Sequence, residues 1–155
     1  MVTLKAMNHE DFQEYVVSSM ETYAKEKVAS GNWSEDESLD LAKKEYSRLL
    51  PEGEKSEFNY LYSIFHNDVN VGMIWIAQKS PENKEEGFIY EIKIYNEYQG
   101  LGYGKMAMIE IETIARQQLG MKKIGLHVFG HNKIARGLYE KLGYETTNVK
   151  MEKRI

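Results

Sequence analysis

The stretch YNEYQGLGYGKMA, residues 95–107, places glycines at positions 100, 102 and 104, directly ahead of a run with helical spacing. Glycine reaches backbone angles that other residues avoid, and a turn from a strand into a helix can require them. Glycine also leaves main-chain amides uncovered, and amides at a helix N-terminus carry partial positive charge. A phosphate can approach such amides closely. The stretch therefore predicts either a plain strand-to-helix turn or a turn that binds phosphate.

The bulk properties favour one soluble globular domain over residues 1–155. The chain has 155 residues, of which 42% are hydrophobic and 28% charged, and both fractions are ordinary for such a domain. It contains no cysteine, which excludes disulfides, thiolate metal sites and a cysteine nucleophile. A formal net charge of -4 argues against a nucleic-acid surface. The N-terminus lacks signal-peptide features, and the apolar runs are strand-sized, so we expect a cytoplasmic protein without a membrane segment.

Upstream of the glycines, periodicity predicts one strand, two helices and then three strands. Asn8 is typical of a helix N-cap, and Ser34 with Glu37 three residues later is typical of a capping box. Asn67 and Asp68 favour a hairpin between two strand-like runs. The polar stretch 79–87 is expected to be a turn. The expected strands are residues 2–7, 59–65, 69–78 and 88–95, and the expected helices run from Asn8 to Gly31 and from Ser34 to Pro51.

Downstream of the glycines, the pattern predicts a helix, a strand and a second helix. The first helix covers 104–119 and stops at Gly120, and the strand covers 122–129. Asn132 is expected to cap the second helix, and Gly143 to end it. The tail 145–155 is expected to be a hairpin or a bent strand. This order of elements is that of a mixed α/β sheet with a strand, glycine turn, helix and strand at its centre.

Two motifs resemble those of the GNAT superfamily of N-acetyltransferases. Residues 99–104, QGLGYG, resemble the family's pyrophosphate loop, and residues 131–144, HNKIARGLYEKLGY, resemble its later motif. The resemblance covers 88–144 well and fades upstream. It implies an α/β (α+β) fold with a twisted, mostly antiparallel mixed sheet of six to seven strands and about four helices, splayed at the acetyl-CoA site. One departure is Asn96, where the family often has proline, so the bend must arise by other means.

The resemblance also implies a site for acetyl-CoA as cosubstrate. Amides of Leu101 to Lys105 would bind the diphosphate, and the strand edge up to Tyr95 would pair with the pantetheine arm. An amide near Ile94 would polarise the thioester carbonyl. Gln99 would brace the loop or touch phosphate, and Asn132 would cap its helix, contact the pantetheine arm, or do both. The residues expected at this site are Ile92, Ile94, Gln99, Gly100, Leu101, Gly102, Tyr103, Gly104, Lys105 and Asn132.

The reaction that the resemblance implies needs an acid and a base. Tyr139 stands where the family's leaving-group acid lies, although its helical spacing also fits a core tyrosine. Glu91 is the preferred base, and the alternative is a solvent-facing strand residue. Tyr90 and His127 are rivals, and His127 on its strand is more typical of an interior histidine. His127 and His131 have the spacing of a metal pair but straddle a strand end, so no metal is expected.

The resulting hypothesis is an acetyl-CoA-dependent N-acetyltransferase that moves an acetyl group to a primary amine by direct attack in a ternary complex. The alternative is a non-catalytic acyl-CoA-binding sensor or interaction domain. The expected partner is a small-molecule or peptide amine, with no nucleic acid and no membrane, and the protein is expected to be a monomer or homodimer. Four aromatic residues are candidates for an acceptor pocket or for the core, namely Tyr15, Tyr23, Trp33 and Tyr46.

Overall fold

The computed structural model describes every residue from Met1 to Ile155 and shows two compact units, Met1–Gly125 and Leu126–Ile155. The expectation of a single domain over 1–155 stays a prediction. No helix is both long enough and apolar enough to span a membrane. In chain order the elements are β1 (Thr3–Ala6), α1 (His9–Ala29), α2 (Glu35–Leu49), a 3-10 turn (Gly53–Lys55), β2 (Asn59–His66), β3 (Val69–Ser80), β4 (Asn83–Ile94), a second 3-10 turn (Asn96–Tyr98), α3 (Tyr103–Gln117), β5 (Lys123–Leu126) and α4 (Lys133–Lys141).

The five strands form one sheet in the order β1-β2-β3-β4-β5, and the first four strands pair antiparallel. Asn67 and Asp68 join β2 to β3 with φ angles of 48° and 62°, which confirms the predicted hairpin. Short polar side chains tolerate this left-handed region better than other residues do. β4, α3 and β5 then form the predicted strand, helix and strand unit behind the glycines. The expected α/β class is therefore correct.

The sequence-based expectation of six to seven strands is wrong by one or two, because the tail 145–155 forms no strand. Every residue of this tail is exposed. A strand is stable only when a neighbour accepts and donates its main-chain hydrogen bonds, and no strand of the sheet pairs with this tail.

The polar stretch 79–87 is also different from the prediction, because β3 continues through Ser80 and β4 begins at Asn83. Only two residues connect these strands. The Lys79 ammonium contacts the Glu86 carboxylate at 2.9 Å across the pair. The charges that resembled a loop are therefore the solvent-facing side chains of a hairpin extension, and such a cross-strand ion pair stabilises it modestly.

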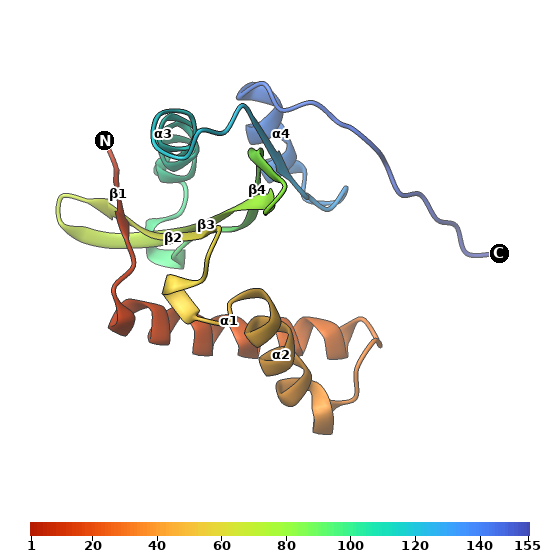
Figure 1. The fold of residues 1–155 in the computed structure, drawn as a ribbon. Helices are drawn as coiled ribbons and strands as arrows, with labels where there is room; N and C mark the ends of the chain where they lie inside the picture. Colours follow the sequence, from red (N-terminus) through yellow and green to blue (C-terminus); the bar gives the residue numbers. More distant parts are fainter. The chain divides into compact units, whose positions relative to one another are not determined.

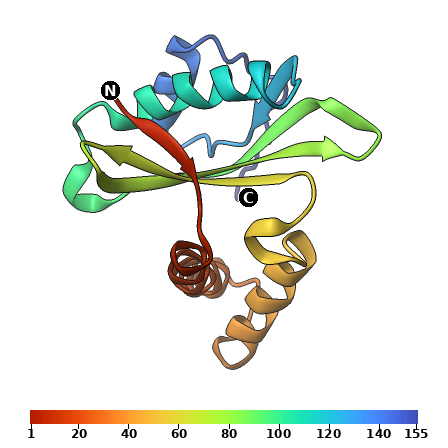
Figure 2. The same ribbon diagram turned by 60° about the vertical axis from the view of Figure 1, so that its left-hand side comes forward.

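Helices cover both faces of the sheet in the first unit. Figures 1 and 2 show α1 and α2 on one face and α3 on the other. The apolar side of α1 packs with Met73 and Trp75 of β3 through Phe12, Tyr15 and Val16. On the opposite face, α3 buries a stripe with helical spacing. That stripe is Ala107, Met108, Ile111, Ile114 and Ala115. Each large apolar side chain buried in this way contributes about 1.5–3 kcal/mol.

The helix starts follow the capping signals only in part. Asn8 accepts a hydrogen bond from the Asp11 amide at 2.7 Å, as predicted. Ser34 is the N-cap of α2, but its side chain makes no capping hydrogen bond, so the predicted capping box does not form. Three acidic residues in the first turn of α2, Glu35, Asp36 and Glu37, favour the positive end of the helix dipole instead.

Candidate active site

A glycine turn carries the chain from the end of β4 into α3. A single 3-10 turn, Asn96–Tyr98, follows β4 and supplies the bend at the position where the resembled family often has proline. Gly100 and Gly102 then adopt φ angles of 79° and 84°, and Gly102 is the N-cap of α3. A residue with a β-carbon would be strained in this region by about 1–2 kcal/mol. The glycines therefore serve the turn whether or not they also serve a ligand.

The N-terminus of α3 has no side-chain cap. Its first main-chain hydrogen bond joins the Met106 amide to the Gly102 carbonyl at 3.2 Å, so the amides of Tyr103, Gly104 and Lys105 find no acceptor within the helix. No acidic residue lies in the first turn, and nothing lies within 4 Å of the β-carbon position of Gly100. Uncovered donors beside a lysine fit an anionic group such as a diphosphate.

Gln99 braces this turn. Its Nε2 donates to the Ile94 carbonyl at 2.9 Å and contacts Asn96 Oδ1 at 3.3 Å, which closes the 3-10 turn onto the end of β4. Of the two roles predicted for Gln99, the structure therefore contains the bracing contact. Leu101 lies exposed between Gly100 and Gly102.

A β-bulge in β4 decides which side chains face α1 and α2. Trp75 of β3 pairs with Glu91, and Ile76 pairs with Ile89, so Tyr90 is the extra residue. Side chains in a regular strand alternate between faces, and a bulge breaks that alternation. Tyr90 stacks on Trp75 with ring centroids 4.5 Å apart, and Tyr90 and Glu91 line the same cavity. The bulge thus places both residues on one face.

Glu91 is held by hydroxyl groups from α1. The Tyr15 hydroxyl donates to Glu91 Oε2 at 2.5 Å, and Ser19 Oγ lies 3.2 Å from Oε2 and 3.4 Å from Oε1. The Tyr46 hydroxyl of α2 donates to Ser19 Oγ at 3.0 Å. Oε1 receives only the longer contact, so it has a lone pair free for an amine or a water molecule.

Burial raises the pKa of Tyr15 well above its ordinary value of 10, and the charge of Glu91 adds to this effect. Burial likewise raises the pKa of Tyr46. Both groups therefore remain protonated donors at neutral pH, and neither can act as a base. Glu91 is the acceptor of the network, which leaves its carboxylate as the group that can receive a proton from a substrate.

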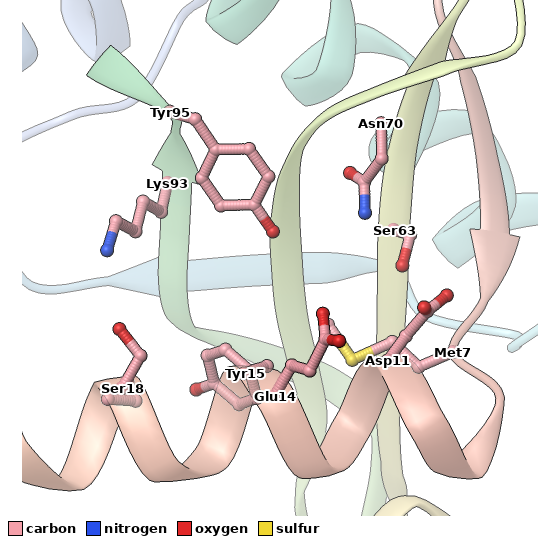
Figure 3. Close-up of a pocket in the computed structure, with 10 residues that line it drawn as sticks. Met7, Asp11, Glu14, Tyr15, Ser18, Ser63, Asn70, Lys93 and Tyr95 are labelled. Carbon is pink, nitrogen blue, oxygen red and sulfur yellow. The ribbon is translucent and has the colours of Figure 1, made fainter.

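Two cavities meet at this network. The larger has a volume of about 570 Å³ and includes Glu91 in its lining, and the smaller, of about 160 Å³, is lined by Tyr15. Both are lined by Ser19 and Lys93, so they are neighbours. Figure 3 shows the smaller cavity between α1 and the strands. Glu91 is therefore reached from the larger cavity and supported from the smaller one.

The larger cavity combines aromatic rings with carboxylates. Trp75 contacts Tyr46 at 6.3 Å between ring centroids, in addition to its stacking on Tyr90, and Glu26 and Glu45 join Glu91 in the lining. Ring faces and carboxylates both attract ammonium groups. The predicted aromatic residues divide accordingly: Tyr23 and Tyr46 line this cavity, Tyr15 lines the smaller one, and Trp33 packs on Tyr23 outside both.

The second unit holds the remaining predicted residues. Tyr139 lies on α4 with its ring edge-on to Tyr144, 6.0 Å between centroids, and burial raises its pKa, so it is a phenol at neutral pH. Asn132 accepts from the Ala135 amide at 3.3 Å and caps α4, as predicted. His127 is exposed, with its ring edge on Phe129. The prediction of an interior histidine is wrong because β5 ends one residue earlier.

Ser19 was not predicted as a site residue, and Tyr15 was predicted only as a pocket aromatic. The sequence contains a weak signal for Ser19 as a site residue. Ser19 lies four residues after Tyr15, so both occupy one face of α1. A hydroxyl on an otherwise apolar helix face indicates a buried polar partner. The identity of that partner, 72 residues away along the chain, is a matter of tertiary structure.

The sheet, the glycine turn, the uncapped helix N-terminus and the held carboxylate are features that the resemblance to GNAT acetyltransferases leads one to expect, and comparison with known proteins supports that resemblance. Residues 17–144 match the Acetyltransferase (GNAT) family. The chain therefore belongs to the GNAT family of acetyltransferases, whose members generally use acetyl-CoA. This membership confirms the predicted fold and the predicted class of enzyme.

Two relatives from Bacillus subtilis strain 168 match along nearly the whole chain. The uncharacterized N-acetyltransferase YycN is 36% identical over 155 residues, which cover 99% of this chain and 99% of YycN. The uncharacterized N-acetyltransferase YdgE is 32% identical over 154 residues, which cover 99% of this chain and 98% of YdgE. The crystal structure of YycN superposes with a TM-score of 0.87 over 100% of this chain and 99% of that chain.

Proposed function

We propose that the protein is an acetyl-CoA-dependent N-acetyltransferase that transfers the acetyl group to a primary amine by direct attack in a ternary complex. The observation that carries the proposal is the Glu91 carboxylate, which Tyr15 and Ser19 hold at the wall of a cavity. Glu91 lies on β4, three residues before the strand ends at Ile94 and the chain enters the glycine turn. The base and the cosubstrate site are thus built on one strand.

The cosubstrate site is proposed to use main-chain groups. The amides of Leu101 to Lys105 hold the diphosphate, while Gln99 keeps the turn in shape and the edge of β4 at Ile92 and Ile94 pairs with the pantetheine arm. The strand lengths support this pairing. Lys122 donates to the Glu85 carbonyl at 2.7 Å, and beyond that contact β4 continues to Ile94 whereas β5 stops at Leu126. Asn132 caps α4, and a contact of its side chain with the pantetheine arm is part of this proposal.

The first proton to move is that of the acceptor. An amine with a pKa near 10 is neutral for only about one molecule in a thousand at pH 7, so attack requires a base. Glu91 Oε1 accepts this proton, directly or through one water molecule. The amine nitrogen then forms a bond to the thioester carbonyl carbon, the carbon–sulfur bond breaks, and the nitrogen releases its second proton to water. The products are an acetamide and the thiolate of CoA.

A separate proton goes to the departing thiolate. A tyrosine is a phenol at neutral pH, and burial raises the pKa of Tyr139 further, so its hydroxyl is available to donate a hydrogen bond or a proton to the sulfur.

The cytoplasmic location and the monomeric or homodimeric state also remain predictions.

A Glu91→Gln variant tests the base. The amide keeps the shape and can still accept from Tyr15, but it cannot take a proton, so we expect kcat/KM for the amine to fall about a hundredfold. Acetyl-CoA affinity, measured by calorimetry, should stay within about twofold of wild type. Glu82→Gln, in the exposed β3–β4 turn, is the control and should change neither quantity. Unchanged turnover in Glu91→Gln would remove Glu91 from the mechanism.

A Tyr139→Phe variant tests the acid. We expect kcat to fall about a hundredfold with acetyl-CoA affinity retained, because only the hydroxyl is lost. Tyr62→Phe is a matched control, since burial also raises the pKa of Tyr62 on β2. If the wild type binds acetyl-CoA but acetylates no amine in a broad panel, the protein is a binding module, and the proposed function is wrong.

A further inference from the structure

In the reaction derived above, the smaller cavity contributes Tyr15 and Ser19 as partners of Glu91 but receives no part of the substrate, although most of its lining residues are polar. Figure 3 shows side chains from α1 and from the strands directed toward one another across it. A cavity of about 160 Å³ is several times the roughly 30 Å³ that one water molecule occupies in the liquid. It has room for an ammonium group and a few methylenes. The lining consists of Met7, Asp11, Glu14, Tyr15, Ser18, Ser19, Ser63, Asn70, Lys93 and Tyr95.

Ser63 of β2 points into this cavity and lacks a partner. Only 2% of Ser63 is exposed, and its Oγ has no hydrogen-bond partner among the groups of the protein. Figure 3 shows the hydroxyl directed toward α1. Buried hydroxyls are nearly always hydrogen-bonded, and an exception calls for a specific explanation. A ligand with N–H donors would satisfy this oxygen.

Two carboxylates without ion pairs face the same space. Asp11 and Glu14 lie three residues apart on α1 and therefore on one side of it, and no cation of the protein lies within salt-bridge distance of either. Their charges add to burial in raising the pKa of Tyr95, so both act on the interior of the cavity. The Lys93 ammonium is directed toward Ser18, away from Asp11 (Figure 3).

We propose that this cavity binds a second ammonium group of the acceptor, so that the substrate is a diamine or polyamine. The inference rests on the proposed function. An ammonium has three donors, and Asp11, Glu14 and Ser63 offer three acceptors. The cavity adjoins the one that contains Glu91, because Ser19 lines both and Tyr15 links them through its bond to Glu91. One nitrogen at Glu91 thus places a second nitrogen, a few carbons away, in the smaller cavity.

Calorimetry on the whole chain saturated with CoA tests the subsite without turnover. Cadaverine and n-pentylamine have the same carbon chain and differ in the second nitrogen. We expect cadaverine to bind at least about tenfold more tightly. Glu14→Gln should reduce this ratio to about two or less, because it removes one charge while keeping the shape. Glu10→Gln, on α1 outside the cavity lining, should leave the ratio unchanged.

Ser63→Ala separates binding from folding. The free protein should melt at the same temperature or higher, because the variant removes a buried hydroxyl that lacks a partner, while the cadaverine affinity should fall severalfold. Equal affinities for the two amines in the wild type, or a cadaverine preference that survives in both Glu14→Gln and Ser63→Ala, would overturn the subsite.

Turnover with acetyl-CoA distinguishes this inference from the proposed function. If both amines are acetylated with equal kcat/KM and bind equally, the transferase stands and the subsite is refuted. If cadaverine binds preferentially but is not acetylated, the subsite stands and the assignment of cadaverine as an acceptor fails. Preferential binding together with preferential acetylation of cadaverine supports both.

Discussion

The N-termini of α1 and α3 differ in how their unpaired main-chain amides find acceptors. At α1, Asn8 caps the Asp11 amide, and Glu10 and Asp11 place negative charge in the first turn. At α3, Gly102 stands in the N-cap position without a side-chain hydrogen bond, the first turn has no acidic residue, and Lys105 adds positive charge. One helix end is satisfied by its own chain, and the other leaves its donors for an anion.

The difference extends to what each helix gives to the site. α1 contributes side chains, because Tyr15 and Ser19 hold Glu91. α3 contributes main-chain amides, which depend on backbone shape rather than on residue type. Substitutions at α1 should therefore act through individual contacts and charges, whereas substitutions at the start of α3 should act through geometry. The four predictions below use this contrast and run from the largest expected effect to the smallest.

Gly102→Val should lower CoA affinity more than a hundredfold, because the side chain covers the amides and the φ of 84° suits glycine alone. Gly120→Val is the matched control: Gly120 has a φ of 67°, and nothing lies within 4 Å of its β-carbon position. Both variants should lose about 1–2 kcal/mol of unfolding free energy. Calorimetry should show the affinity loss only for Gly102→Val, and equal losses would contradict the loop assignment.

Lys105→Glu gives α3 the acidic first turn that α1 has. We expect the free energy of unfolding in urea to rise by about 0.3–1 kcal/mol, because the charge now suits the helix dipole. CoA affinity should fall about tenfold, since a negative charge faces the diphosphate. The mirror variant Glu10→Lys should lose stability and leave CoA affinity unchanged. A Lys105→Glu variant with wild-type affinity would place the diphosphate elsewhere.

Alkaline denaturation measures how far Tyr15 is removed from solvent. Its pKa is raised in the folded chain, so above pH 10 the folded state retains a proton that the unfolded state has lost. Stability must then fall as pH rises, by at most about 1.4 kcal/mol per pH unit from this one group. Tyr15→Phe removes the contribution, and its unfolding free energy should decline less steeply between pH 10 and 11. Parallel slopes would mean that Tyr15 ionises freely.

Asn8→Ala should cost about 1 kcal/mol of unfolding free energy, because the Asp11 amide loses its acceptor. CoA affinity should not change, since no residue of α1 belongs to the proposed cosubstrate site. A drop in CoA affinity without a drop in stability would contradict this contrast, because it would mean that the N-terminus of α1 also contributes to CoA binding.

Local signals predicted most elements correctly. Asn8 marked the start of α1, Asn67 and Asp68 marked the β2–β3 turn, and the glycines marked the passage into α3. Each of these depends on the conformational preference of one or two residues, so a single sequence is sufficient to find it. The strand expected in the tail 145–155 is absent, and the turn expected over 79–87 is confined to residues 81–82, because strand formation depends on a neighbouring strand that local composition does not reveal.

The candidate site divides in the same way. The glycine turn and Gln99 lie within a few residues of one another, and their arrangement follows from short-range geometry. The fixing of Glu91 depends on contacts across 76 residues to Tyr15 and 72 to Ser19, and the bulge at Tyr90 depends on pairing with β3. Glu91 was a reasonable choice of base on its position, but its partners and its face of the sheet could not be read from β4 alone.

By itself, the sequence determined the glycine turn, the helix that follows it and the order of elements, because backbone preferences and apolar periodicity act over a few residues. The tertiary structure alone decided that Tyr90 and Glu91 share a face, that hydroxyls of α1 hold the carboxylate, and that Ser63 points without a partner into a second cavity. Those features depend on contacts between strands and helices that are far apart in the sequence. Such contacts are determined by the packing of the core rather than by the conformational preference of single residues.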